Sequence, residues 1–337
     1  MPSFNLAIVG FGHVGRAFLR LLIAKETELR RKYDIRWRLT GVATRRVGWL
    51  ADADGFNPIA LVNGYWPAPA LNAPPHNVRE WLERAKADVF FEASSLAVEN
   101  GQPATEHVRA ALESGAHAIS ANKGPVVHAY RNLAALAKEK DRRFLFESTV
   151  MDGVPIFSLF PLGLPATQLR AFHGVLNSTT NVVLTEIEKG RTLGDAVEKA
   201  QALGIAETDP AADLDGWDAA VKLVALAIVL MGADLKIEQV QRTGIRDLSE
   251  EKIRSARAAG MRYKLVCRAE RRGEGVQCSV QPELLLATDP LAGLEGTSSA
   301  IRFDLDMFGL SIVEHNPGIE ATAYGLLADF VRAATPG

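Results

Sequence analysis

The segment spanning residues 207–222 carries the most chemically suggestive side chains of this sequence. Asp218 and Lys222 are four residues apart, so on a helix they share one face. Lys222 is the only charged residue in the stretch 219–233, which predicts a helix buried nearly all round. A buried ammonium is costly unless it is paired. An ammonium held beside a carboxylate can deliver a proton to a carbonyl oxygen, so we favour a catalytic role for Asp218 and Lys222. The alternative is a structural one, in which Asp215 caps the helix and Asp218 and Lys222 form a surface ion pair.

A glycine pattern near the N-terminus predicts a second kind of site. It follows a short apolar strand, opens a helix, and consists of Gly10, Phe11, Gly12, His13, Val14 and Gly15. In a dinucleotide fingerprint the first glycine makes the tight turn, the second lets a pyrophosphate approach, and the third lets the helix pack closely. The helix N-terminus then offers unpaired N–H groups to the phosphates. The alternative is a strand-to-helix turn that binds nothing.

The cofactor's ribose should be recognised where the second strand ends. An acid stands about 20 residues past the last glycine at Asp34, but it precedes that strand, whereas ligands meet the carboxyl end. That end offers Thr44, Arg45 and Arg46, a hydroxyl and two guanidinium groups. Because arginine pairs well with phosphate, we predict that NADP is accepted and preferred over NAD. Alternatively, the two arginines are solvated loop charges.

The elements that position these residues read as two different architectures. Strands at 5–9, 35–43, 88–92, 117–120 and 143–147 alternate with helices at 14–31, 78–87, 103–114 and 130–140, around an irregular region at 47–78 with one short helix. This alternation predicts a Rossmann-type, doubly wound parallel sheet. Beyond residue 150 we expect strands at 169–176, 264–267, 276–280 and 301–303, and helices from 181, over 219–233 and at 321–332. This part should be an α+β domain with a mixed or antiparallel sheet.

Length and composition set the broad class. The chain has 337 residues, which suits two domains of roughly 150 residues each. A net charge of −2 gives no sign of binding to nucleic acid or an anionic membrane. Cys267 and Cys278 are expected to be buried thiols in a reducing cytoplasm, although a pair across a hairpin is possible. No signal peptide is evident, and the apolar run at 219–233 is shorter than the roughly 20 residues of a membrane span.

Five motifs together resemble the homoserine dehydrogenase family. They are the glycine loop, the tripeptide Ala121-Asn122-Lys123, the stretch Asn177-Ser178-Thr179-Thr180-Asn181, the 207–222 segment with its Asp-x-x-Gly-x-Asp-x-x-x-Lys pattern, and a late Pro-Gly followed by Thr322-Ala323. The resemblance covers nearly the whole chain. It implies the reversible, NAD(P)-dependent reduction of L-aspartate 4-semialdehyde to L-homoserine. The similarity is to the short form without a C-terminal ACT domain, so we expect no threonine feedback through such a domain.

The resemblance also implies roles for individual residues. Lys222 would give the proton to the aldehyde oxygen, and Asp218 would help hold the substrate or its water. The substrate's ammonium end would be bound by Glu207 and Asp213, and the same pocket would be lined by Thr179 and Ser178. Lys123 would touch both cofactor and substrate. The remaining cofactor contacts would be Ala93, Ser94, Ser95 and Gly318.

Further implications concern the metal, the domains and the assembly. The family resemblance predicts a monovalent cation at Glu147 and Val150. It divides the chain into a dinucleotide-binding domain, residues 1–147 plus 308–337, and a substrate-binding and dimerisation domain, residues 148–307. A homodimer through the second domain's sheet is expected. Two rival functions remain: a dehydrogenase of another amino-acid aldehyde or alcohol, and an NADP-binding sensor without turnover.

Overall fold

The computed structural model describes residues 2–67 and 75–335. The chain forms two compact units: Met1–Ile156 with Ile319–Gly337, called here the first unit, and Phe157–Gly318, the second unit. The chain thus changes unit after residues 156 and 318, whereas the sequence predicted changes after residues 147 and 307. Part of its irregular region, residues 68–74, lies outside the described residues.

The first unit is built on a six-stranded sheet. In sheet order the strands are β3 (Gly48–Ala51), β2 (Arg36–Thr44), β1 (Ser3–Val9), β4 (Val89–Glu92), β5 (His117–Ser120) and β6 (Phe144–Leu145). All described neighbours pair in parallel except β2 and β3. The predicted doubly wound sheet is therefore confirmed. The sequence analysis missed β3, which returns antiparallel to β2 after the turn at Arg45 and Arg46.

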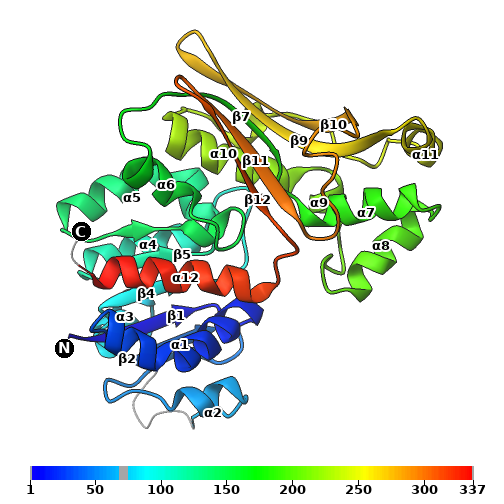
Figure 1. Cartoon of the computed structure of the whole chain (residues 1–337). Coiled ribbons are helices and arrows are strands. Elements are labelled where there is room, and N and C mark those ends of the chain that lie inside the picture. The colour runs from blue at the N-terminus through cyan, green and yellow to red at the C-terminus, as the bar shows by residue number, and fades with distance from the viewer. Residues whose placement is uncertain (1, 68–74, 336–337) are drawn as a thin grey trace. The chain divides into compact units, whose positions relative to one another are not determined.

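Helices cover both faces of this sheet (Figure 1). They are α1 (His13–Lys32), α2 (Pro58–Val62), α3 (Val78–Ala85), α4 (Ala104–Glu113), α5 (Gly124–Glu139) and α12 (Ile319–Ala334). The late helix α12 packs beside α1, so the end of the chain completes the first unit's core. Phe18, Phe91 and Phe330 meet there, with the rings of Phe18 and Phe91 4.5 Å apart at their centroids.

The second unit holds another six-stranded sheet. Its order is β12 (Gly309–Glu314), β11 (Ser299–Leu305), β7 (Leu169–Val175), β9 (Met261–Arg272), β10 (Gly275–Leu286) and β8 (Gln241–Arg242). The described pairs are antiparallel apart from β10 with β8. This confirms the predicted mixed sheet. The strands expected at 264–267 and 276–280 are the central parts of one long hairpin, in which Cys267 and Cys278 are buried free thiols.

The helices of the second unit position its polar residues. They are α6 (Ile156–Gly163), which starts at the last residue before the unit, α7 (Ser178–Glu188), α8 (Leu193–Ala202), α9 (Ala211–Leu214), α10 (Trp217–Met231) and α11 (Glu250–Ala258). The apolar helix predicted at 219–233 is α10, which packs on β9 and β10. The expectation that Asp215 caps it is wrong. Gly216 takes the N-cap position with φ +79°, because Asp215 still belongs to the turn that ends α9.

Candidate active site

The second unit brings Lys222 and Asp218 together as the sequence predicts. Both lie on α10, one turn apart, with Lys222 Nζ 2.8 Å from Asp218 Oδ2. Lys222 Nζ also donates to the carbonyl oxygen of Leu176 at 2.8 Å. The two side chains are 18% and 21% exposed, so this ion pair is mostly withdrawn from water while remaining accessible to a ligand. Such a pair is less screened than a surface salt bridge.

Asn177 connects this pair to a second carboxylate. Its Nδ2 donates to Asp213 Oδ1 at 2.6 Å and to Asp218 Oδ2 at 3.1 Å. Its Oδ1 accepts from the Thr180 amide at 2.8 Å and thereby caps α7. Thr179 Oγ1 donates to Asp213 Oδ2 at 2.8 Å. One amide group therefore holds two carboxylates in place and fixes the start of the helix that carries Thr179.

The sequence analysis included Asn177 in a motif but gave it no role. A signal existed, because an asparagine between a strand and a helix is a common N-cap. Its Nδ2 contacts could not be predicted, since Asp213 and Asp218 come from elements that are distant in sequence. Burial raises the pKa of Asp213, and the negative charge of Asp218 raises it further, whereas the bonds from Asn177 and Thr179 lower it. The cluster thus combines a proton donor with carboxylates suited to a cationic group.

Two predicted substrate residues are placed differently from this cluster. Ser178 Oγ donates to the carbonyl oxygen of Thr297 at 3.1 Å. Glu207 is exposed, and its main-chain carbonyl accepts a hydrogen bond from Gln201 Nε2 at 3.0 Å. Asn177 bonds the carboxylates of Asp213 and Asp218, and in the described part of the chain Glu207 is not among its partners.

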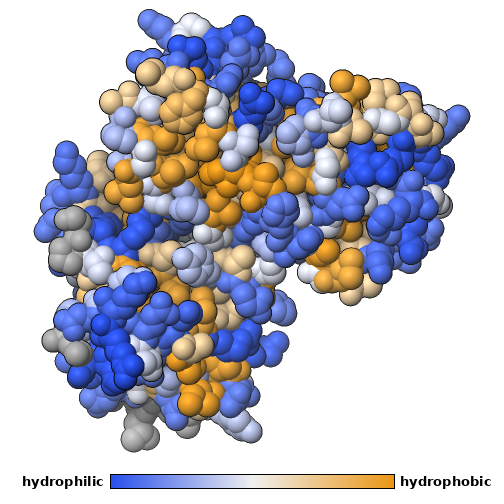
Figure 2. Space-filling model, in the orientation of Figure 1, coloured by the Kyte–Doolittle hydropathy of each residue, from blue (hydrophilic) through white to orange (hydrophobic). Residues whose placement is uncertain are grey.

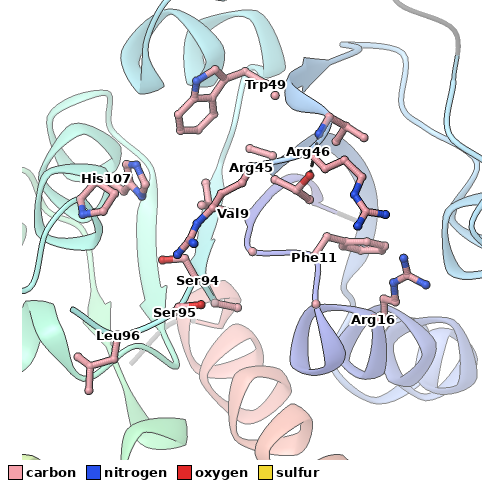
Figure 3. A pocket seen from close by; sticks show the side chains of 18 of the residues that line it. Val9, Phe11, Arg16, Arg45, Arg46, Trp49, Ser94, Ser95, Leu96 and His107 are labelled. Carbon is pink, nitrogen blue, oxygen red and sulfur yellow. Dashed lines mark hydrogen bonds between the residues drawn. The ribbon is translucent and has the colours of Figure 1, made fainter. Parts of the chain in front are cut away.

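The first unit contains a cavity of about 780 Å³ (Figure 3). Its lining residues come from the glycine loop, the end of β2, the β3 start, and the segments that follow β4: Val9, Gly10, Phe11, Gly12, Arg16, Ala43, Thr44, Arg45, Arg46, Val47, Gly48, Trp49, Trp66, Ala93, Ser94, Ser95, Leu96, Ala97, Gln102, Pro103 and His107. Thus the cavity gathers the loop, the arginines and the serines that the sequence assigned to the cofactor. His13, Val14 and Gly15 instead form the first turn of α1.

The three glycines of the loop have different surroundings. A Cβ on Gly10 would collide with the carbonyl oxygen of Ala93, and Gly10 has φ +87°. A Cβ on Gly15 would collide with the carbonyl oxygen of Gly10. Gly12 faces open space and starts α1 without a side-chain cap. The first and third glycines therefore allow close packing, and the second leaves the helix N-terminus open to a phosphate. These residues fit a dinucleotide.

Three arginine side chains line the cavity, two of them near Phe11 (Figure 3). Figure 3 shows Arg46 and Arg16 ending on either side of Phe11, while Arg45 reaches toward Ser94. The guanidinium carbon of Arg16 lies 5.9 Å from the centre of the Phe11 ring. The sequence analysis missed Arg16, although its place one residue after the third glycine puts it in the first turn of α1.

A buried carboxylate supports the serine segment of the cavity. Glu92 is fully buried, accepts from the Ser94 amide at 2.8 Å, and lies 2.7 Å from Nδ1 of His107. From the opposite side, Asn122 Nδ2 donates to the carbonyl oxygens of Ser94 and Ser95 at 3.1 and 3.2 Å. Within the tripeptide that the sequence singled out, Asn122 therefore shapes the cavity wall. His107, to which the sequence gave no role, also lines the cavity.

The remaining predicted residues are placed as follows. Lys123 follows β5 and precedes α5, at the carboxyl end of the parallel sheet where ligands bind. Gly318 is the last residue of the second unit and follows Pro317, whose carbonyl accepts from Thr297 Oγ1. Glu147 and Val150 are buried, and the Glu147 carboxylate accepts from Arg332 Nη1 at 3.1 Å.

Comparison with known proteins identifies the family. A family model described as homoserine dehydrogenase matches residues 155–331, and one described as the homoserine dehydrogenase NAD-binding domain matches residues 10–147. The chain belongs to the homoserine dehydrogenase family. Its sequence resemblance to that family is thereby confirmed, as is NAD(P) as the class of cofactor.

Several members of the family are similar over their full length. The NAD(+)-dependent homoserine dehydrogenase of Pseudomonas canavaninivorans is 34% identical, with 98% of this chain and 96% of the relative covered. The homoserine dehydrogenase of Sulfurisphaera tokodaii is 31% identical, with 97% of each covered. Among solved structures, a putative homoserine dehydrogenase from Archaeoglobus fulgidus matches with TM-score 0.85, 28% identity and full coverage of both chains. A hyperthermophilic archaeal homoserine dehydrogenase in complex with NADPH matches with TM-score 0.82, 28% identity and 98% coverage of each chain.

Proposed function

We propose that this member of the family reversibly reduces L-aspartate 4-semialdehyde to L-homoserine, a step of threonine and methionine biosynthesis. The carrying observation is the Lys222–Asp218 ion pair at 2.8 Å, joined by Asn177 to the carboxylate of Asp213. Asp213 and Glu207 would bind the ammonium end of the substrate, and Thr179 and Ser178 would line the same pocket. The cofactor, when bound, supplies or accepts the hydride.

Lys222 is the proposed proton donor. During aldehyde reduction its ammonium gives a proton to the oxygen that becomes the hydroxyl, and Asp218 stabilises and orients that ammonium. In the oxidative direction Lys222 must be neutral to accept the proton. Homoserine oxidation should therefore accelerate from neutral to alkaline pH, and a flat profile would argue against this assignment. Lys123 is proposed to contact cofactor and substrate.

The test is Lys222→Met, which keeps the length of the side chain and removes the charge. Because a positioned acid or base contributes roughly 10²–10⁴-fold, homoserine oxidation should fall by at least about a hundredfold. Binding of NADP⁺, measured by calorimetry, should stay within twofold because Lys222 lies outside the cavity of the first unit. Lys252→Met, on an exposed helix position, is the matched control. If unmodified protein binds NADP⁺ tightly but oxidises neither homoserine nor related amino alcohols, it is a sensor.

We propose that NADP is preferred over NAD, and that Arg45, Arg46 and Thr44 contact its ribose and phosphate. Three arginines, these two and Arg16, line one cavity, and guanidinium groups pair well with a phosphate dianion. Thr44 contributes by holding the turn, since its Oγ1 accepts from the Val47 amide at 3.1 Å. Gly10 to Gly15, Ala93 to Ser95 and Gly318 are proposed to contact the rest of the dinucleotide.

Coenzyme preference can be measured directly. The double variant Arg45→Gln, Arg46→Gln should raise the KM for NADP by about tenfold or more, since each charge-assisted bond contributes roughly 1.5–3 kcal/mol. The KM for NAD should change less than twofold. An unmodified enzyme that uses NAD more efficiently than NADP, as the name of the Pseudomonas relative suggests for that protein, would refute the preference.

A monovalent cation at Glu147 and Val150 is proposed with a changed ligand set. The Glu147 carboxylate is already paired with Arg332, and the Glu147 amide donates to Asp329 Oδ2 at 2.8 Å. We propose that the main-chain carbonyls of Glu147 and Val150 take part in holding the ion. In the described part of the chain, no three His, Cys, Asp or Glu side chains group as metal ligands would.

We also propose a homodimer formed through the second unit's sheet. Figure 2 shows apolar surface over the strands of this unit. Large apolar side chains on or beside these strands are exposed, namely Leu284, Leu286, Met307, Phe308 and Val313. Apolar patches of this kind mark protein interfaces.

Among the described residues, no helix is long and apolar enough to cross a membrane. A cytoplasmic location is proposed from the two thiols, which are free.

A further inference from the structure

A lysine lies in the interior of the second unit, away from the Lys222 cluster. Lys264, on β9, has a fully buried side chain. Its Nζ donates to Asn181 Oδ1 at 2.6 Å and to the carbonyl oxygen of Leu294 at 2.5 Å. The acceptors belong to α7 and to the segment before β11, so one ammonium links three parts of the unit.

Keeping a charge at this position is energetically unfavourable. Burial lowers the pKa of Lys264 to about 8, opposed by the negative charges of Glu188 and Glu295 and reinforced by the positive charges of Arg262 and Arg257. A buried ionic group of this kind is often replaceable by apolar residues without loss of stability. What this ammonium contributes is therefore sought in the geometry that its two hydrogen bonds specify.

The bonds of Lys264 hold a defined loop. Residues 294–298, called here the 294–298 loop, accept three further bonds from α7. Asn181 Nδ2 donates to the carbonyl oxygens of Gly296 at 3.0 Å and Ser298 at 3.5 Å, and Ser178 Oγ donates to that of Thr297 at 3.1 Å. Thr297 Oγ1 in turn donates to the Pro317 carbonyl oxygen at 3.0 Å. The loop therefore fixes Ser178 on one side and the approach to Gly318 on the other.

We propose that Lys264 is a positioning residue for the substrate site, acting through the 294–298 loop on the hydroxyl of Ser178. The inference rests on the proposed function, in which Ser178 lines the substrate pocket. It adds a residue that touches neither substrate nor cofactor. Removing the ammonium would leave Asn181 Oδ1 and the Leu294 carbonyl without their shared donor, and the loop could relax away from α7.

The experiment is a double-mutant cycle between Lys264→Met and Ser178→Ala, read as the KM and kcat for homoserine. Lys264→Met should raise the KM about tenfold and change kcat by less than about threefold, since it displaces a binding group rather than the proton donor. The double variant should have nearly the KM of the worse single variant, because both changes disable the same hydroxyl. Lys252→Met combined with Ser178→Ala is the control, whose effects should multiply.

Other outcomes have distinct meanings. If Lys264→Met lowers the thermal midpoint but leaves the KM unchanged, or if its effect on KM multiplies with that of Ser178→Ala, the residue is structural and the inference is wrong. If Lys264→Met does not fold, Lys264→Gln, which keeps one amide donor, takes its place in the same cycle. Absence of homoserine turnover by the unmodified protein would instead overturn the proposed function.

Discussion

Replacing Asn177 by aspartate tests the electrostatics of the substrate cluster with almost no change of shape. The variant Asn177→Asp keeps an oxygen that can accept from the Thr180 amide, so the cap of α7, which contributes about 1 kcal/mol, survives. It loses the Nδ2 donor to Asp213 and Asp218 at 2.6 and 3.1 Å. A third carboxylate then stands beside two others.

The magnitude follows from these two bonds. Hydrogen bonds to charged groups contribute roughly 1.5–3 kcal/mol each, so losing two should lower the free energy of unfolding by about 3–6 kcal/mol at pH 7.5. Crowded carboxylates raise one another's pKa, so at lower pH one takes up a proton and restores a donor. An acid whose folded pKa is raised stabilises the fold at low pH and loses that effect as pH rises. The deficit of Asn177→Asp should therefore shrink at pH 5.

Urea unfolding at both pH values, with hydrogen exchange of α7 as a local readout, measures the effect. Asn177→Ala is the matched comparison, because it removes the cap and both donors without adding a charge. Its deficit should shrink less at pH 5 than that of Asn177→Asp, because losing the Asn177 bond raises the pKa of Asp213 but adds no third carboxylate. If Asn177→Asp is as stable as the unmodified protein at pH 7.5, or if its deficit does not shrink at pH 5, the assigned role of the Asn177 amide is refuted.

Two further predictions use other parts of the chain. Gly10→Ala should abolish measurable NADP⁺ binding in calorimetry, because a Cβ there collides with the Ala93 carbonyl and the backbone has φ +87°. Gly12 faces open space, so Gly12→Ala should fold normally and weaken NADP⁺ binding only by crowding the phosphate. Burial lowers the pKa of Lys264 from 10.5 to about 8, so between these pH values the unfolded chain binds more protons than the folded one. The free energy of unfolding should therefore rise over this range, by at most about 1.4 kcal/mol per pH unit. Lys264→Met should lack that rise in urea titrations.

The parts of the fold that could be predicted from sequence are those encoded locally. The β1–α1 turn is specified by closely spaced glycines, and α10 by an apolar run with a single lysine. The short strand β3 escaped prediction because only its pairing with β2 makes it a strand. β12 lies at the sheet edge with alternating exposed and half-buried residues, so it lacks the fully buried apolar run of a core strand.

The candidate site divides in the same way. Asp218 and Lys222 are one helical turn apart, and their contact could be predicted from spacing alone. Glu92 supports the cofactor cavity through a local bond from Ser94 and through His107, and the His107 contact depends on how α4 packs beside β4. Lys264 is an unremarkable charge in a strand sequence, and only the packing of α7 against β9 makes it a buried link.

The two carboxylates of the substrate cluster are held by different kinds of partner, and this difference suggests a division of roles. Asp218 contacts the ammonium of Lys222, so its charge is balanced within the protein, as suits the proposed role of orienting the proton donor. Asp213 is held by the amide of Asn177 and the hydroxyl of Thr179, both uncharged donors, and burial raises its pKa. A substrate ammonium would supply the positive charge at contact distance that these donors do not, and would favour the ionised carboxylate. Binding of the amino acid and ionisation of Asp213 would therefore promote each other, which makes Asp213 the carboxylate best suited to select a substrate that carries an ammonium group.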